Sequence, residues 1–272
     1  MKVEGRIAVV TGAAGGIGGA VVRALVAAGA STVVATDVAK PGVEALASSL
    51  PAGRVIPRAL DVTDEAATVA LVEEIERTIG PVDLFFANAG LAGGGGPEQP
   101  DAVWDAQWKV NVMAHVYATR ALLPGWLERG RGHLVTTASM AGILATIGDG
   151  VYSATKHAAV GYAEWLAFSY RSKGITVSCV CPGAVDTAML RGTAGGDADK
   201  AAASIGGGDV MPASEAATRI LEGVEADRFL IMTHPDMVSF TVGKAQDTDR
   251  WIRGMARLDA RSREMLGPDA GW

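Results

Sequence analysis

The strongest constraint on the fold of this chain is a regular alternation of two kinds of segment. Short runs rich in β-branched residues, typical of buried strands, are separated by longer stretches with the periodicity of amphipathic helices. The predicted strands cover residues 6–11, 31–37, 54–62, 82–90, 132–139, 175–181 and 228–234, and the predicted helices cover 16–29, 64–79, 102–129, 150–173 and 213–226. Strand, helix, strand repeated in this way predicts an α/β fold, a doubly wound parallel sheet of about seven strands with helices on both faces.

The chain shows no break in composition that would mark a second domain, so we expect residues 1–272 to form one domain. Apolar residues make up 49% of the sequence and charged residues 20%, as suits a sheet that is buried on both faces. Two segments, 91–100 and 191–209, are irregular and rich in glycine. Residues 235–272 are expected to form a helical tail.

Charge and cysteine usage exclude several classes of function. The formal net charge of −6 includes no basic run, which disfavours nucleic acid and anionic membranes as partners. No export signal is visible near Met1, so a cytoplasmic location is expected, with Cys179 and Cys181 as buried free thiols. The histidines lack metal-ligand spacing, and no metal site is expected.

A glycine-rich turn, "TGAAGGIGGA", joins the first predicted strand to the first predicted helix. Glycine lets the backbone approach a pyrophosphate closely, and the helix N-terminus offers free N–H groups to it. The spacing fits G-x-x-x-G-x-G through Gly12, Gly16 and Gly18, or G-x-x-G-x-x-G through Gly12, Gly15 and Gly18. Asp37 closes the second strand 19 residues after Gly18, as a dinucleotide site requires. The alternative is a tight turn that binds no ligand.

Tyr152 and Lys156 stand four positions apart in "GVYSATKHAAVG" and therefore share one helical face. A phenol has a pKa near 10 and is a poor acid or base at neutral pH. An ammonium about 4 Å away, at an effective dielectric near 20, favours the phenolate by up to ~4 kcal/mol. The pair can therefore form an acid/base group, although an isolated Y-x-x-x-K is more often an amphipathic helix edge. His157 points off this face and is interpreted as structural.

Six elements of the sequence together resemble the short-chain dehydrogenase/reductase family. They are "TGAAGGIG", "NAG" at 88–90, Asn111, Ser139, "YSATK" and "PGAVDT" at 182–187, in the family's order and spacing over roughly residues 5–190. The resemblance implies a Rossmann-type fold and a nicotinamide-dependent alcohol dehydrogenase or ketone reductase that assembles as a homodimer or homotetramer. The final third departs from the family pattern and lacks its usual "VDGG"-like ending.

The resemblance assigns catalytic roles to four residues. Tyr152 transfers the proton, while Lys156 lowers the pKa of Tyr152 and binds the cofactor ribose. Ser139 orients the substrate oxygen. Asn111 holds a water that links Lys156 to solvent, with a packing or capping role in the helix as the alternative.

The resemblance also implies the residues that line the cofactor. Asp61 and Val62 are expected beside the adenine, and Thr187 at the nicotinamide carboxamide. The full expected set is Gly12, Gly16, Ile17, Gly18, Asp37, Asp61, Val62, Asn88, Ala89, Gly90, Tyr152, Lys156, Pro182, Gly183, Val185 and Thr187. NAD is expected over NADP, because the charge of Asp37 repels a 2′-phosphate and Gly15 stands where NADP-binding relatives often carry a basic side chain. Lys40 is the one cation nearby that could oppose this preference.

The substrate is expected to be an uncharged, hydrophobic secondary alcohol or ketone. Residues 188–209 are predicted to form a lid, with 191–209 as a plain connector in the alternative interpretation. The segment after Ser139 offers Ile143 and Leu144 but no Arg, Lys or His to bind an anion. The expected substrate residues are Ser139, Ala141, Ile147, Met189 and Leu190. The rival functions are a non-catalytic NAD-binding sensor of the same fold and a carbohydrate-active relative.

Overall fold

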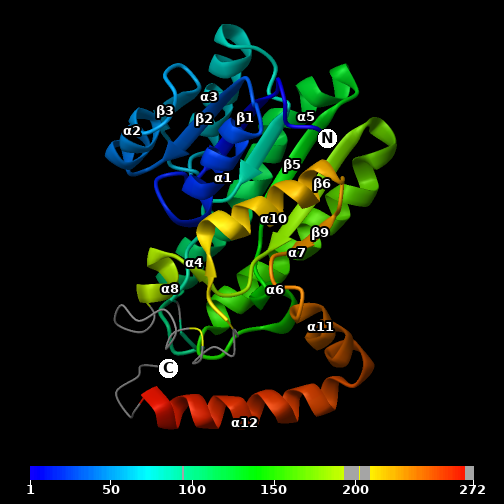
Figure 1. The fold of residues 1–272 in the computed structure, drawn as a ribbon. Coiled ribbons are helices and arrows are strands. Elements are labelled where there is room, and N and C mark those ends of the chain that lie inside the picture. The colour runs from blue at the N-terminus through cyan, green and yellow to red at the C-terminus, as the bar shows by residue number, and fades with distance from the viewer. Residues whose placement is uncertain (94, 193–201, 203–208, 267–272) are drawn as a thin grey trace.

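The fold is built on one seven-stranded sheet, seen in a computed structural model that describes residues 1–93, 95–192, 202 and 209–266 (Figure 1). The strand order is β3-β2-β1-β4-β5-β6-β9, and every pair is parallel. The strands are β1 (Ile7–Thr11), β2 (Thr32–Asp37), β3 (Val55–Ala59), β4 (Leu84–Ala87), β5 (Gly132–Thr137), β6 (Ile175–Cys181) and β9 (Leu230–Met232). The predicted α/β fold is thus confirmed. The strand order reverses between β1 and β4, which creates the crevice where such sheets bind ligands.

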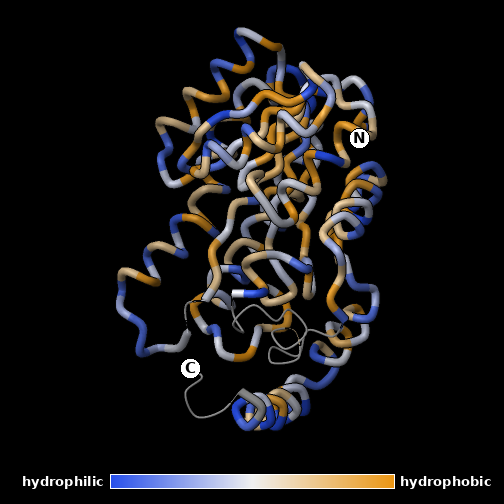
Figure 2. The backbone as a smooth tube through the Cα atoms, turned by 60° about the vertical axis from the view of Figure 1, so that its left-hand side comes forward, coloured by the Kyte–Doolittle hydropathy of each residue, from blue (hydrophilic) through white to orange (hydrophobic). Residues whose placement is uncertain are grey.

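Helices cover both faces of the sheet. On one face lie α1 (Gly16–Ala27), α2 (Lys40–Ser48) and α10 (Ala213–Glu225), whose apolar side chains share a core with β1 and β2. On the other face lie α3 (Glu65–Thr78), α5 (Ala114–Arg129) and α7 (Gly150–Tyr170), packed over a second core. In Figure 2, hydrophobic residues gather towards the middle of the tube and hydrophilic residues towards its outside. The near-continuous apolar strands follow from this burial on two faces.

The predicted helix over 102–129 is continuous in space but not uniform. It consists of α4 (Asp101–Trp108), a π-helical turn (Lys109–Met113) and α5. Wide π turns are frequent at functional sites, and this one contains Asn111. The sequence prediction missed α2 altogether, although Pro41 in its first turn is a recognisable helix-start signal.

Short elements gather at the carboxyl ends of the strands. They are α6 (Ala141–Leu144), α8 (Ala188–Gly192) and the two-stranded pair β7 (Val185–Asp186) with β8 (Met211–Pro212). Of the predicted lid, residues 193–201 and 203–208 lie outside the described part of the chain. Leu190 of α8 is buried in a small cluster with Ala184 and Ala202.

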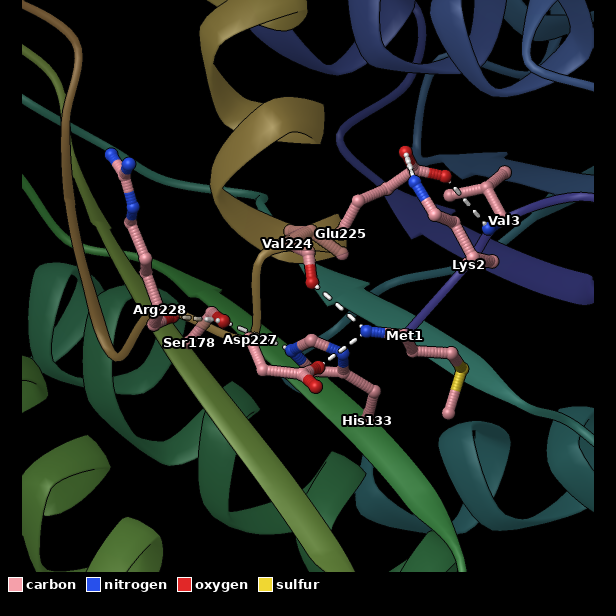
Figure 3. Close-up of polar contacts among 9 residues, drawn as sticks. All are labelled: Met1, Lys2, Val3, His133, Ser178, Val224, Glu225, Asp227 and Arg228. Atoms are coloured by element: carbon pink, nitrogen blue, oxygen red, sulfur yellow. Dashed lines mark hydrogen bonds and ion pairs between the residues drawn. The ribbon is translucent and has the colours of Figure 1, made fainter.

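The amino ends of the strands are tied together by polar contacts (Figure 3). The N–H of Val3 donates to Glu225 Oε1 over 3.1 Å. Ser178 Oγ donates to the carbonyl of Arg228 over 2.6 Å and lies 2.9 Å from Nε2 of the buried His133. Burial lowers the pKa of His133 to about 3, so its imidazole is neutral. These contacts lie at the end of the sheet away from the crevice and fix its edge.

The chain continues into two helices, α11 (Met237–Gln246) and α12 (Thr248–Leu266), as the predicted helical tail. Met237 is buried against the main core, and the rings of Phe240 and Trp251 lie 6.2 Å apart between the two helices. Figure 1 shows α12 extending past the carboxyl ends of the strands, and Figure 2 shows hydrophobic and hydrophilic residues alternating along it. Among the described residues no helix combines the length and hydrophobicity that crossing a membrane requires.

Candidate active site

A cavity of about 660 Å³ opens at the carboxyl ends of the central strands. This volume suits a ligand of dinucleotide or drug size. All but two of the expected cofactor residues line it, from the glycine turn after β1 to Thr187 before α8. Asp61 and Val62 are the two that do not. Asp61 Oδ1 instead accepts hydrogen bonds from the N–H and the hydroxyl of Thr63.

The glycine turn is shaped for close approach of a ligand to backbone. A Cβ on Gly18 would lie 2.2 Å from the carbonyl oxygen of Gly12, and Gly12 and Gly16 have φ of +64° and +54°. Gly15 is extended, with φ −166°, and a Cβ there would meet no atom within 4 Å. The structure therefore requires glycine at 12, 16 and 18, which decides between the two spacings. Helix α1 starts with no side-chain cap, so its first turn presents backbone N–H groups to the cavity.

Asn88 and Thr11 hold the end of β4 against the end of β1. Thr11 Oγ1 accepts the N–H groups of Asn88 and Ala89 at 2.9 and 3.1 Å. Asn88 Nδ2 donates to the carbonyl of Thr11, and its Oδ1 accepts the hydroxyl of Thr137. These bonds form the floor of the cavity.

Asp37 lies at the opposite wall from α7, at the end of β2. Its Oδ2 accepts the N–H of Ala14 at 3.0 Å, and its Oδ1 accepts the N–H of Ala39 at 2.9 Å. The carboxylate thus braces the glycine turn as well as adding negative charge to this end of the cavity.

Ser139, Tyr152 and Lys156 meet at the centre of the cavity, the first from the end of β5 and the others from α7. Lys156 is 2% exposed; its Nζ donates to the carbonyl of Thr137 at 2.8 Å and lies 5.5 Å from the centre of the Tyr152 ring. Burial lowers the pKa of Lys156 to about 8. Burial also raises the pKa of Tyr152 to about 12, against a smaller lowering by its hydrogen bond with Ser139.

The expected lowering of the Tyr152 pKa by Lys156 is not seen. The ammonium is bonded to a backbone carbonyl, is farther from the ring than the ~4 Å assumed from sequence, and itself has a lowered pKa. Burial, which disfavours the charged phenolate, is therefore the largest influence on the pKa of Tyr152 and raises it.

Asn111 lies behind the cavity rather than in its lining. Its Oδ1 accepts the N–H of Leu91, and its Nδ2 donates to the carbonyl of Leu91, both at 2.9 Å. Nδ2 also donates to Thr155 Oγ1 at 3.0 Å. The amide therefore joins the segment after β4 to the catalytic helix.

The five expected substrate residues all line the cavity. Leu144 does so as well, whereas Ile143 is absent from the lining, and its carbonyl accepts a hydrogen bond from Lys244 of α11. That contact ties the one-turn helix α6 to α11.

Several lining residues were not predicted: Ala92, Gly93, Gly95, Gln99, Asp149 and Met237. The signal for the first four was present, because the irregular segment 91–100 follows a strand end. Asp149 could have been found as an N-cap, since it stands directly before the predicted helix. Met237 could not, because it reaches the cavity from a distant helix.

The ring of His234 packs against the segment 182–187 at Gly183. A Cβ on Gly183 would lie 2.7 Å from His234 Nδ1, and that nitrogen lies 2.8 Å from the hydroxyl of Thr233.

Among the described residues no group of His, Cys, Asp or Glu could hold a metal ion. Cys179 and Cys181 are buried free thiols, 4.0 Å apart.

The reversed strand order, the glycine turn and the cavity at the carboxyl ends of the strands define a dinucleotide-binding fold of the Rossmann type. The chain belongs to the short-chain dehydrogenase/reductase family: the profile described as short chain dehydrogenase matches residues 6–196. The resemblance seen in the sequence is thereby confirmed.

Relatives and solved structures agree with this assignment. The chain is 37% identical over 246 residues to the 1-deoxy-11-beta-hydroxypentalenate dehydrogenase of Streptomyces avermitilis, covering 87% of each protein. It superposes with a TM-score of 0.82 on a short-chain dehydrogenase/reductase of Burkholderia phymatum in complex with NAD, at 28% identity and covering 92% of this chain and 96% of the other. A short-chain dehydrogenase of Burkholderia cenocepacia in complex with NADP gives a TM-score of 0.78 at 25% identity, covering 95% and 99%.

Proposed function

We propose that this protein is an NAD-dependent alcohol dehydrogenase or ketone reductase acting on uncharged, hydrophobic secondary alcohols or ketones. The observation that carries the proposal is the convergence of Ser139, Tyr152 and Lys156 in the cavity that the glycine turn enters. Membership of the family supports the same reaction type.

The residues present fit a nicotinamide dinucleotide. The backbone around Gly12 and Gly18 is too close-packed for side chains and leaves N–H groups for a pyrophosphate. Lys156 and Thr187 lie farther along the same cavity, where the ribose and the carboxamide would be held. When bound, the nicotinamide accepts or donates the hydride.

In the direction of oxidation, the hydroxyl of Ser139 holds the substrate oxygen and Tyr152 takes its proton. Because burial holds the pKa of Tyr152 at about 12, the phenolate needs additional positive charge. The Lys156 ammonium, which here donates to the Thr137 carbonyl, would supply part of it and would hold the cofactor ribose. An oxidised cofactor would supply further positive charge. Activity in this direction is therefore expected to rise with pH.

Asn111 is proposed to hold the water that links Lys156 to solvent. A Cβ added to Gly90 would lie 3.4 Å from both Asn111 Oδ1 and Lys156 Nζ, so both groups lie close to Gly90. The amide also anchors Leu91, so the residue supports the cavity wall in addition to any relay.

The lining of the cavity supports an uncharged substrate. Apolar side chains such as Leu144, Ile147 and Leu190 surround its substrate end, and Lys156 is the one cation among the described lining residues. Asp149 adds negative charge there, which disfavours phosphates and carboxylates. The Streptomyces relative, by its name, acts on a hydroxylated carboxylate, which supports an alcohol as the reacting group but does not support the absence of an anionic group.

Preference for NAD rests on Asp37, whose carboxylate would repel a 2′-phosphate. One solved relative is in complex with NAD and another with NADP, so the proposed preference is inferred from the residues of this chain. Lys40 lies 3.6 Å from Glu44, which partly neutralises the one cation that could favour NADP.

The experiment that tests the reaction is Tyr152→Phe, with Tyr162→Phe on the same helix as the matched control. We expect Tyr152→Phe to abolish turnover of secondary alcohols, measured at 340 nm, while NADH binding stays within a few fold, because only the titrating oxygen is lost. Tyr162→Phe should keep most of its activity. More than about a tenth of wild-type activity in Tyr152→Phe would remove this residue from the acid/base role. A wild-type protein that binds NADH but turns over no alcohol or ketone would instead favour a sensor.

A further inference from the structure

We propose that Asp149 is a positioning residue that fastens the glycine-rich backbone at Gly93 and Gly95 to the start of α7, and so fixes one wall of the substrate pocket. The proposal rests on the proposed function, because it assigns Asp149 an effect on the reaction of Tyr152. The sequence analysis predicted no contact between Asp149 and Gly93.

The two oxygens of the Asp149 carboxylate bind different parts of the chain. Oδ1 caps α7 by accepting the N–H of Tyr152 at 2.9 Å. Oδ2 accepts the N–H of Gly93 at 2.7 Å, across 56 residues of sequence. The carbonyl of Gly95 accepts the N–H of Gly150 at 2.9 Å, so a backbone bond reinforces the same junction.

The segment is also anchored at its beginning. Asn111 bonds both the N–H and the carbonyl of Leu91. Between these anchors, Ala92, Gly93 and Gly95 face the cavity, and the two glycines have φ of +86° and +75°. These three residues add no side chain larger than a methyl group and so leave room for a broad substrate, but glycine backbone has high conformational freedom. Its position therefore depends on the two anchors.

The charge of Asp149 acts on Tyr152 as well. It contributes to the high pKa of Tyr152, together with burial and the Cys181 thiol of β6, while the Ser139 hydroxyl acts in the opposite direction. Lys156 of α7 is the cation that faces the same ring. The same carboxylate thus holds the wall in place and makes a smaller contribution than burial to the raised pKa of Tyr152.

The test uses Asp149→Asn and Asp149→Ser. Asparagine keeps the shape and one acceptor but loses the charge and the second acceptor, and serine keeps the helix cap but is too short to reach Gly93. The matched controls are Asp64→Asn and Asp64→Ser. Asp64 caps α3 in the same way, because its Oδ1 accepts the N–H of Ala67. Unlike Asp149, it does not line the cavity.

Three measurements are made on the full chain. Hydrogen exchange at the amide of Gly93 should accelerate by about tenfold or more in both Asp149 variants. KM for a bulky alicyclic alcohol should rise by roughly fivefold or more. The rising limb of the oxidation rate against pH should move to lower pH by ~0.3 or more, because removing a negative charge lowers the pKa of Tyr152. The Asp64 variants should show none of these changes.

Unchanged exchange at Gly93, or kinetics that match the Asp64 variants in both KM and the pH limb, would overturn the proposal. The exchange measurement needs no turnover. If the wild-type protein oxidises no alcohol, the proposed function fails while accelerated exchange at Gly93 still supports the tether, so the two failures are distinguishable.

Discussion

Lys156 carries a buried ammonium that the fold alone does not favour. Its Nζ donates to Thr137, and burial lowers its pKa from 10.5 to about 8. A difference of this size corresponds to about 3 kcal/mol against folding while the group is charged in both states. We interpret this loss of folding stability as the consequence of placing a charged ammonium in the proposed cofactor site.

The nucleotide-free protein should therefore become more stable when this charge is removed. Lys156→Met is expected to raise Tm by roughly 4–8 °C at pH 7, with the exposed Lys173→Met as a control that changes little. Since the folded-state pKa is the lower one, the wild-type deficit is full below pH 8 and shrinks as pH rises from about 8 towards 10.5. The difference in Tm between the wild type and Lys156→Met, measured by thermal unfolding across this pH range, checks the prediction. A deficit that stays constant with pH would show that packing, not charge, is responsible.

A second prediction at the residue scale concerns Asp37, to which we attribute the proposed cofactor preference. Asp37→Asn keeps an acceptor for Ala14 or Ala39 but removes the charge that repels a 2′-phosphate. We expect the ratio of kcat/KM for NAD to that for NADP to fall by about tenfold or more. A wild-type ratio at or below one would contradict the proposed NAD preference.

At the scale of elements, the turn between β1 and α1 combines two kinds of glycine. Gly18 is required by packing, whereas Gly15 is extended and has open space around its Cα. Gly18→Ala is expected to weaken NADH binding by at least about tenfold, because its Cβ must displace the Gly12 carbonyl. Gly15→Ala should bind nearly as wild type does. Fluorescence titration with NADH compares them, and equal affinities would show that the turn relaxes.

At the scale of the whole molecule, α7 presents an aromatic surface to solvent on the side away from the cavity residues. Phe168 is 69% exposed and Trp165 is 48% exposed, and the ring of Trp165 stacks on Tyr162 and meets Tyr170 edge-on. Exposed apolar patches of this kind mark association sites. The homodimer or homotetramer expected from the family stays a prediction that this surface favours.

The self-association test is Phe168→Glu, with Ser172→Glu, just beyond α7, as the control for added charge. Light scattering after size exclusion should give a multiple of 27.9 kDa for the wild type and the control, and a smaller species for Phe168→Glu. A wild-type monomer would exclude the predicted assembly, and an unchanged oligomer in Phe168→Glu would place the interface elsewhere.

Local sequence patterns were sufficient for the parallel sheet, the glycine turn and the facing of Tyr152 and Lys156. Strand and helix periodicities and a four-residue spacing act within one element, so they are visible without knowing what packs against it. Spacing along the chain likewise located Ser139 and the segment 182–187, through the family resemblance.

Other features depend on groups far apart in sequence, and only the tertiary structure decided them. The contacts of Asp149 with Gly93 and of Asn111 with Leu91 join segments 56 and 20 residues apart. The position of Ile143 outside the pocket depends on α11, and the pKa of Tyr152 near 12 depends on everything that shields its ring from water. Burial and long-range hydrogen bonds are properties of the packed chain, whereas the sequence shows only which residues are available to form them.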